Sequence, residues 1–178
     1  MKVAPLQIGD CFFTEVSVSA NPDGKEADLN QIVCNVLPEH FLRDKQNPRE
    51  WCIILRTAIV AKEGSAPPYV GKVEVFGTFS VDKSWPADKI EQLVYINGSG
   101  ILYSVVREMI CNITARGVWK MLLLPSLSFM EMYKDVLSAR AAEDAKKATA
   151  GEIQSAAVGQ APAPLTSPPA PPSTTKAA

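Results

Sequence analysis

Residues 101–129, ILYSVVREMICNITARGVWKMLLLPSLSF, contain the pattern that decides the fold. Up to Arg116 the apolar positions recur with the period of an α-helix, and Gly117 follows as a stop signal. At 100° per residue the apolar side chains cover roughly 200° of the helix, whereas packing on a single sheet requires only about 100°. These side chains are Ile101, Leu102, Tyr103, Val105, Val106, Met109, Ile110 and Ile113. The extra width predicts a second burial partner, which for so small a domain is most economically another copy of the chain.

The next segment, VWKMLLLPSLS at 118–128, is too apolar for an ordinary solvated connection. Unbranched Met and flexible Leu side chains adapt to varied partners, so this segment could form a buried interface or a peptide-binding groove. Core packing within the chain or an oligomer is an equally open interpretation. Ser128 and Glu131 have the spacing of a capping box, which predicts another helix after the segment.

Upstream of this region the first eighty residues alternate apolar and polar side chains with a period of two. The pattern predicts strands at 6–19, 31–37, 51–62 and 69–81, the last two forming a hairpin with one solvated face. In the first strand we expect Phe12, Val16 and Val18 on one face, and we expect His40 on a surface loop. A helix should begin near Ser84–Pro86 and break at 97–100. Strands followed by helices indicate the α+β class.

Composition divides the chain into a folded part and a tail. The chain has 178 residues, 47% of them hydrophobic, and a net charge of −1, which leaves no basic excess for nucleic acid. Residues 139–178 contain no aromatic side chain, and six prolines lie between Pro162 and Pro172. We therefore expect a domain at 1–138 and an Ala/Pro-rich disordered tail at 139–178. Neither a secretory signal nor a membrane-spanning run is visible, so we expect a cytoplasmic protein without membrane insertion.

No combination of residues indicates catalysis. The four cysteines, 11, 34, 52 and 111, include no C-x-x-C pair, and His40 is the only histidine. We expect reduced and mostly buried thiols, no metal and no disulfide. No glycine-rich phosphate loop is present, and Arg107–Glu108 is read as an ordinary polar strip. The sequence therefore predicts neither an enzyme nor a cofactor.

The helix and the segment after it resemble the signature region of the SecB family of protein-export chaperones. The matching residues, at the family's spacing, are Leu102–Tyr103, Arg107–Glu108, Arg116–Gly117 and Leu124–Pro125, with looser matches at Gly77–Val81 and Phe13–Pro22. The resemblance covers about 6–138. It implies a SecB-like four-stranded antiparallel Greek-key sheet with helices packed on one face. It also implies a homotetramer, a dimer of dimers that would bury Ile101, Leu102, Val105, Met109 and Ile113.

The resemblance further implies that non-native polypeptide clients bind without ATP near Trp119, Met121, Leu123 and Leu127. It makes the motor SecA a candidate partner, docking on a sheet face that includes Glu15, Ser19, Val70 and Lys72. This chain departs from the family there, because Ser19 and Lys72 stand where acids are expected. Ser104 also replaces a proline, and the tail lacks the family's character.

Three functions follow as hypotheses. The first is a holdase for preproteins of Sec-dependent export. The second is a SecB-like chaperone dedicated to another client, such as the antitoxin of a toxin–antitoxin pair. The third is a structural oligomer without clients.

Overall fold

The computed structural model describes residues 3–24 and 32–157, and describes side chains as far as residue 143. The chain divides into two compact units, Met1–Val136 and Leu137–Ala178. The first unit contains the sheet and the helices packed on it. Within the described residues, no helix is long and apolar enough to cross a membrane.

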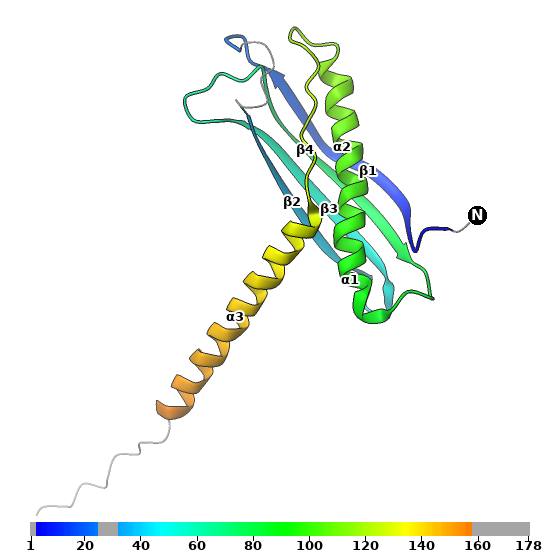
Figure 1. Cartoon of the computed structure of the whole chain (residues 1–178), viewed down its shortest axis with the longest axis vertical. Coiled ribbons are helices and arrows are strands. Elements are labelled where there is room, and N and C mark those ends of the chain that lie inside the picture. The colour runs from blue at the N-terminus through cyan, green and yellow to red at the C-terminus, as the bar shows by residue number, and fades with distance from the viewer. Residues whose placement is uncertain (1–2, 25–31, 158–178) are drawn as a thin grey trace, which may run out of the picture. The chain divides into compact units, whose positions relative to one another are not determined.

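Four antiparallel strands form one sheet in the order β1-β4-β3-β2 (Figure 1). They are β1 (Leu6–Ala20), β2 (Ile32–Asp44), β3 (Asn47–Ala61) and β4 (Tyr69–Val81). Hairpins join β2 to β3 and β3 to β4, and β1 returns beside β4, which is Greek-key connectivity. The predicted fold class is confirmed.

A bulge in β1 changes which side chains share a face. Phe13 lies opposite Val75, but the next pair is Glu15 with Glu74, so Thr14 is an extra residue in β1. One extra residue moves every later side chain to the other face. Phe12 therefore faces outward beside Phe76, with ring centroids 5.1 Å apart, whereas Val16 faces the helices opposite Val73. The prediction that Phe12 and Val16 share a face was wrong.

His40 lies within β2 and not on a surface loop. The strand continues through Pro38 to Asp44, because β2 is an edge strand and an edge tolerates the missing proline N–H. The His40 ring stacks on Trp51 at 5.7 Å and meets the edge of Tyr95 at 5.3 Å. Its Nε2 lies 2.8 Å from Oε1 of Glu91, and its side chain is only 8% exposed. The surface-loop prediction was therefore wrong.

The helical region is continuous where the sequence predicts a break. It consists of η2 (Ala87–Lys89), α1 (Ile90–Leu93), the π-turn η3 (Val94–Gly98) and α2 (Ser99–Thr114). A Cβ on Gly98 would lie 2.5 Å from Cδ1 of Ile53, so this glycine permits a close approach to β3. It does not interrupt the helix.

The hydrophobic core lies between α2 and one face of the sheet (Figure 1). Leu102, Val106 and Ile110 of α2 are fully buried, as are Leu55 and Val75 of the sheet. Leu102 packs so closely that a Cβ on Gly77 would lie 2.8 Å from its Cδ2. The prediction that Leu102 contributes to an oligomer interface was therefore wrong, since its own chain already buries it completely.

Helix α3 (Phe129–Ala157) extends beyond the predicted end of the folded part. The amide N–H of Glu131 lies 3.4 Å from Oγ of Ser128, which agrees with the predicted capping box. Residues 139–157 of the expected tail are helical. The disorder predicted for 158–178 falls outside the described residues.

Candidate functional site

Residues 118–128 join α2 to α3, and we call them the connector. They run back along α2, on the same side of the sheet as that helix (Figure 1). The side chains of Leu122 and Leu124 are each 1% exposed, whereas Met121 and Leu123 are 53% and 51% exposed. This alternation is typical of an extended backbone, in which successive side chains point in opposite directions. The connector therefore contributes Leu122 and Leu124 to the core and keeps Met121 and Leu123 at the surface, together with Val118 at its start, which is 80% exposed.

The middle of the connector is bound to α2 through main-chain atoms. The Leu122 N–H donates to Oγ1 of Thr114 at 2.9 Å, and that hydroxyl donates to the Ile110 carbonyl at 2.7 Å. The Cys111 thiol lies 3.5 Å from the Leu122 carbonyl oxygen and donates to it. Both polar main-chain groups of Leu122 are thus satisfied inside the core, as buried amide groups require.

Two further side chains of α2 bind the next carbonyls. Arg107 donates from Nε to the Leu124 carbonyl at 3.0 Å, and the Tyr103 hydroxyl donates to the Pro125 carbonyl at 2.8 Å. The contacts move toward the start of α2 as the connector advances, so the two segments run antiparallel. Arg107 is therefore a residue that positions the connector. The sequence reading of an ordinary polar strip missed this role, because no local pattern indicates it.

The start of the connector is held by Tyr69 and Trp119. The Tyr69 hydroxyl accepts the Trp119 N–H at 3.1 Å and donates to the Trp119 carbonyl at 3.0 Å. The indole N–H of Trp119 donates to the Asn21 carbonyl at 3.0 Å. Trp119, predicted to contact clients, is half-buried and anchors the connector to the end of β1.

A pocket of about 390 Å³ lies at the far end of the connector. Its lining combines strand β2 with the connector and α3, and consists of Cys34, Asn35, Val36, Leu37, Leu127 and Met132. Burial raises the pKa of the Cys34 thiol, which disfavours the thiolate that nucleophilic chemistry would need. Of the four predicted client residues, Leu127 lines this pocket and Met121 and Leu123 lie on the exposed side of the connector. The pocket is therefore mainly apolar, with a single thiol whose ionisation is disfavoured.

Four of the five predicted interface residues remain accessible along one flank of α2. Ile101 and Ile113 are each 36% exposed, and Val105 and Met109 are partly exposed. The connector contacts the opposite flank through Tyr103, Arg107 and Cys111. Helix α2 is therefore covered by the sheet and the connector but keeps a free apolar flank.

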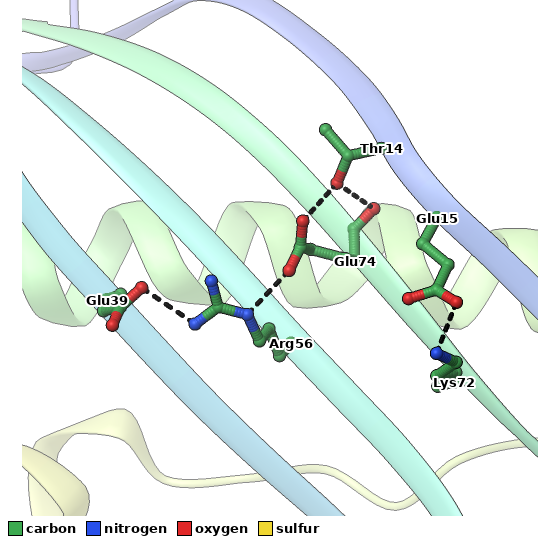
Figure 2. Close-up of polar contacts among 6 residues, drawn as sticks. All are labelled: Thr14, Glu15, Glu39, Arg56, Lys72 and Glu74. Carbon is green, nitrogen blue, oxygen red and sulfur yellow. Dashed lines mark hydrogen bonds and ion pairs between the residues drawn. The ribbon is translucent and has the colours of Figure 1, made fainter.

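The predicted docking residues Glu15, Ser19, Val70 and Lys72 come together on the outer face of the sheet. Ser19 lies opposite Val70 in the β1–β4 pair, and the carboxylate of Glu15 lies 2.5 Å from Nζ of Lys72 (Figure 2). The one acid of this set is therefore paired with a cation.

The remaining charges at the centre of this face are also paired with one another. Arg56 lies between Glu39, at 2.8 Å, and Glu74, at 2.6 Å (Figure 2). The Thr14 hydroxyl donates to Glu74 at 2.6 Å. That hydroxyl, followed by Arg56, holds the pKa of the Glu74 carboxyl below its ordinary value. Each of the three acids has a cationic partner, and because Arg56 serves two of them, the group of five charges carries a net charge of only −1.

The cysteines differ in exposure: Cys11 is exposed, Cys34 and Cys111 are partly buried, and Cys52 is buried. The sequence predicted mostly buried thiols, whereas only one of the four is fully buried. All four have free thiols. In the described part of the chain, no three His, Cys, Asp or Glu side chains gather as a metal site would require.

Comparison with known proteins gives a family match over residues 38–140, to the family described as preprotein translocase subunit SecB. The protein-export protein SecB of Roseobacter denitrificans is 26% identical over 148 residues, covering 83% of this chain and 87% of that protein. The protein of the same name from Ehrlichia canis is 30% identical over 98 residues, covering 51% of this chain and 55% of that protein.

Among solved structures, the chain is similar to the Mycobacterium tuberculosis SecB-like chaperone Rv1957, in complex with a ChAD peptide from the HigA1 antitoxin. The TM-score is 0.52 at 15% identity, over 70% of this chain and 88% of that one. This likeness supports the fold. The family match spans the strands β3 and β4, helix α2 and the whole connector, and on this ground the chain belongs to the SecB family.

Proposed function

We propose that the chain is an ATP-independent holdase that binds non-native polypeptides on the exposed side of the connector. The carrying observation is the fixed exposure of Met121 and Leu123, each about half exposed, beside two leucines that are 1% exposed. Holding two large apolar side chains in water is unfavourable by itself, and exposed apolar patches of this kind mark interaction sites. SecB-family membership supports this function, and we place it in the cytoplasm.

The client surface consists of the outward connector side chains and the pocket that continues it. Met121 and Leu123 supply apolar area, and Leu127 and Met132 line the pocket against β2. Flexible Met and Leu side chains adapt to different client sequences, as a promiscuous binder requires. Trp119 borders this surface and keeps the start of the connector in place.

The test is suppression of aggregation of an unfolded model client by the full chain. Met121→Asp introduces a charge where an apolar client side chain would lie, so we expect clearly weaker suppression. Ser17→Asp is the matched control, because it adds the same charge at an exposed polar position of β1, on the outer face of the sheet and away from the connector. Equal suppression by both variants and the unchanged chain would contradict the proposal.

We further propose a homotetramer that buries the free flank of α2, formed by Ile101, Val105, Met109 and Ile113. Burial of apolar area drives such association. Ile101→Glu and Met109→Glu should therefore reduce the sedimentation coefficient, while Glu63→Lys in the β3–β4 turn should not. The alternative of a purely structural oligomer predicts that Met121→Asp also changes the assembly. A Met121→Asp variant with an unchanged assembly and weaker client binding separates the two.

A chaperone dedicated to a single client, such as an antitoxin, is the second candidate. The observation that favours it is the pairing of the acids on the outer face with cations of the same chain, Glu15 with Lys72, and Glu39 and Glu74 with Arg56. Because these acids already have partners, the face would attract a basic segment of the motor SecA only weakly. Lys72→Glu should strengthen binding of SecA if this face is an altered docking site. Unchanged SecA binding favours the dedicated chaperone.

A further inference from the structure

The connector has one main-chain edge that is bound to α2 and one that is open. In an extended chain, the N–H and C=O of one residue point to the same side, and those of its neighbours point to the other side. Both groups of Leu122 and the carbonyl of Leu124 bind side chains of α2. Over Met121–Leu124 this alternation directs the N–H and C=O of Met121 and Leu123 away from α2. The alternation ends at Pro125, whose carbonyl also binds α2, through Tyr103.

These four groups have no hydrogen-bond partner among the described residues. The side chains of Met121 and Leu123 are about half exposed, so solvent reaches both residues. Their main-chain groups recur at every second residue, about 6.5–7 Å apart, which is the spacing at which a neighbouring strand offers its own N–H and C=O groups. The connector therefore presents the hydrogen-bonding edge of a short β-strand next to exposed apolar side chains.

Resting on the proposed holdase function, we propose that the client binds as an extended strand that pairs with the main chain of Met121 and Leu123. The occupant is a segment of unfolded polypeptide with apolar side chains at alternate positions. Main-chain hydrogen bonds supply affinity in this mode of recognition, and alternate side chains add the preference for apolar clients. Because every polypeptide has the same main chain, this pairing accepts clients of unrelated sequence. It disfavours folded proteins, in which most main-chain groups are already paired.

The hydrogen bonds on the other edge make this pairing possible. Thr114, Cys111 and Arg107 fix Leu122 and Leu124, so the extended backbone is ordered before a client arrives. An ordered edge avoids the entropy cost of straightening a flexible loop on binding. These side chains are positioning residues, since they act on the client through the connector.

The test is residue-resolved amide hydrogen exchange of the full chain, with and without a synthetic peptide in which valine alternates with threonine and lysine. We expect the peptide to slow exchange at Met121 and Leu123 by about tenfold or more. The Leu122 amide is the internal control, because Thr114 already accepts its hydrogen bond.

A peptide that binds without slowing exchange at Met121 and Leu123 overturns the pairing but does not contradict the holdase function. A peptide that does not bind at all contradicts the function itself. Protection of both amides before the peptide is added, unchanged afterwards, would mean that another copy of the chain covers the edge, and would also overturn the proposal.

A second measurement uses variants and a modified peptide. Leu123→Pro removes one of the two outward N–H groups, and Leu123→Ala keeps it while losing a similar apolar area. We expect Leu123→Pro to weaken peptide binding about tenfold more than Leu123→Ala does. The same peptide, N-methylated at every second residue to remove donors, should bind about tenfold more weakly to the unchanged chain. Equal affinity of the methylated and unmethylated peptides would overturn the proposal even if Leu123→Pro disturbs the connector.

Discussion

The connector and the outer face of the sheet both expose apolar side chains, but they differ in whether the polar groups beside these side chains have partners within the chain. On the outer face, Phe12 is 51% exposed beside Phe76, and the neighbouring charges Glu15, Glu74 and Arg56 already have partners within the chain. On the connector, Met121 and Leu123 are equally exposed, and their main-chain groups have no partner among the described residues. Exposed apolar area alone therefore does not distinguish a binding site. The connector combines exposed apolar area with open main-chain groups on an extended backbone, and the proposed client site rests on this combination.

Within the connector, the largest expected difference is between the inward and outward leucines. Leu122→Ala removes a fully buried side chain and should lower the free energy of unfolding by about 2–5 kcal/mol. Leu123→Ala changes a half-exposed side chain and should cost less than about 1 kcal/mol. Urea denaturation of both variants measures the difference. Similar losses for the two leucines would show that the connector does not alternate in solution.

The next largest effect concerns the hydroxyl that fixes the connector to α2. Thr114→Val keeps the shape of the side chain but leaves the buried Leu122 N–H without an acceptor, which should cost about 1–3 kcal/mol. Thr114→Ser keeps the hydroxyl and should retain most of this stability. Urea denaturation together with exchange of the Leu122 amide checks the prediction. If Thr114→Val left that amide fully protected, the connector would be held by other contacts.

The smallest effect concerns the self-paired charges of the outer face. Thr14 donates the hydrogen bond that most lowers the pKa of Glu74, so Thr14→Val should raise this pKa toward its ordinary value of 4.5. A carboxyl with a lowered pKa stabilises the folded chain above pH 4.5, and this stabilisation is lost as the pH falls through the lowered value. In Thr14→Val, the free energy of unfolding should therefore fall less as the pH drops below 4.5. Thr14→Ser keeps the hydroxyl and should preserve the larger fall. Carboxyl NMR titration of Glu74 measures the shift, and an unchanged pKa in Thr14→Val would show that Arg56 and Lys72 set it without Thr14.

The strands, the β3–β4 hairpin and the apolar helix were predictable, because alternation and helical periodicity are local properties of the sequence. The Greek-key sheet was expected only from the resemblance to the SecB family. The bulge at Thr14 was not, since it inserts one residue into a pattern that still looks alternating on each side. Pro38 suggested the end of a strand, but its position at the sheet edge, which only the fold reveals, removes the objection to a proline. Gly98 likewise suggested a helix break. Its actual role, a close approach to Ile53, depends on a residue that is far away in the sequence and could not be predicted locally.

The candidate site was predicted in part. The apolar composition of the connector indicated a binding surface, and Met121, Leu123 and Leu127 lie where such a surface would be. No local pattern indicated that Trp119 would anchor the connector or that Arg107, Cys111 and Thr114 would bind its main chain. These contacts join residues that are near in space only after α2 and the connector run antiparallel. Leu102 was assigned to an interface because helical periodicity does not tell which part of a wide apolar face meets the sheet.

The most direct test of the account compares client affinity between the two regions. An unfolded protein that stays soluble, such as reduced and carboxymethylated lactalbumin, is titrated with Leu123→Asp, with Lys72→Glu and with the unchanged chain. A charge on the outward side of the connector should weaken binding by about tenfold or more, because it removes apolar contact and adds a desolvation cost. Lys72→Glu should leave the affinity for this client unchanged. The opposite result, with affinity lost in Lys72→Glu and kept in Leu123→Asp, would contradict the assignment of client binding to the connector.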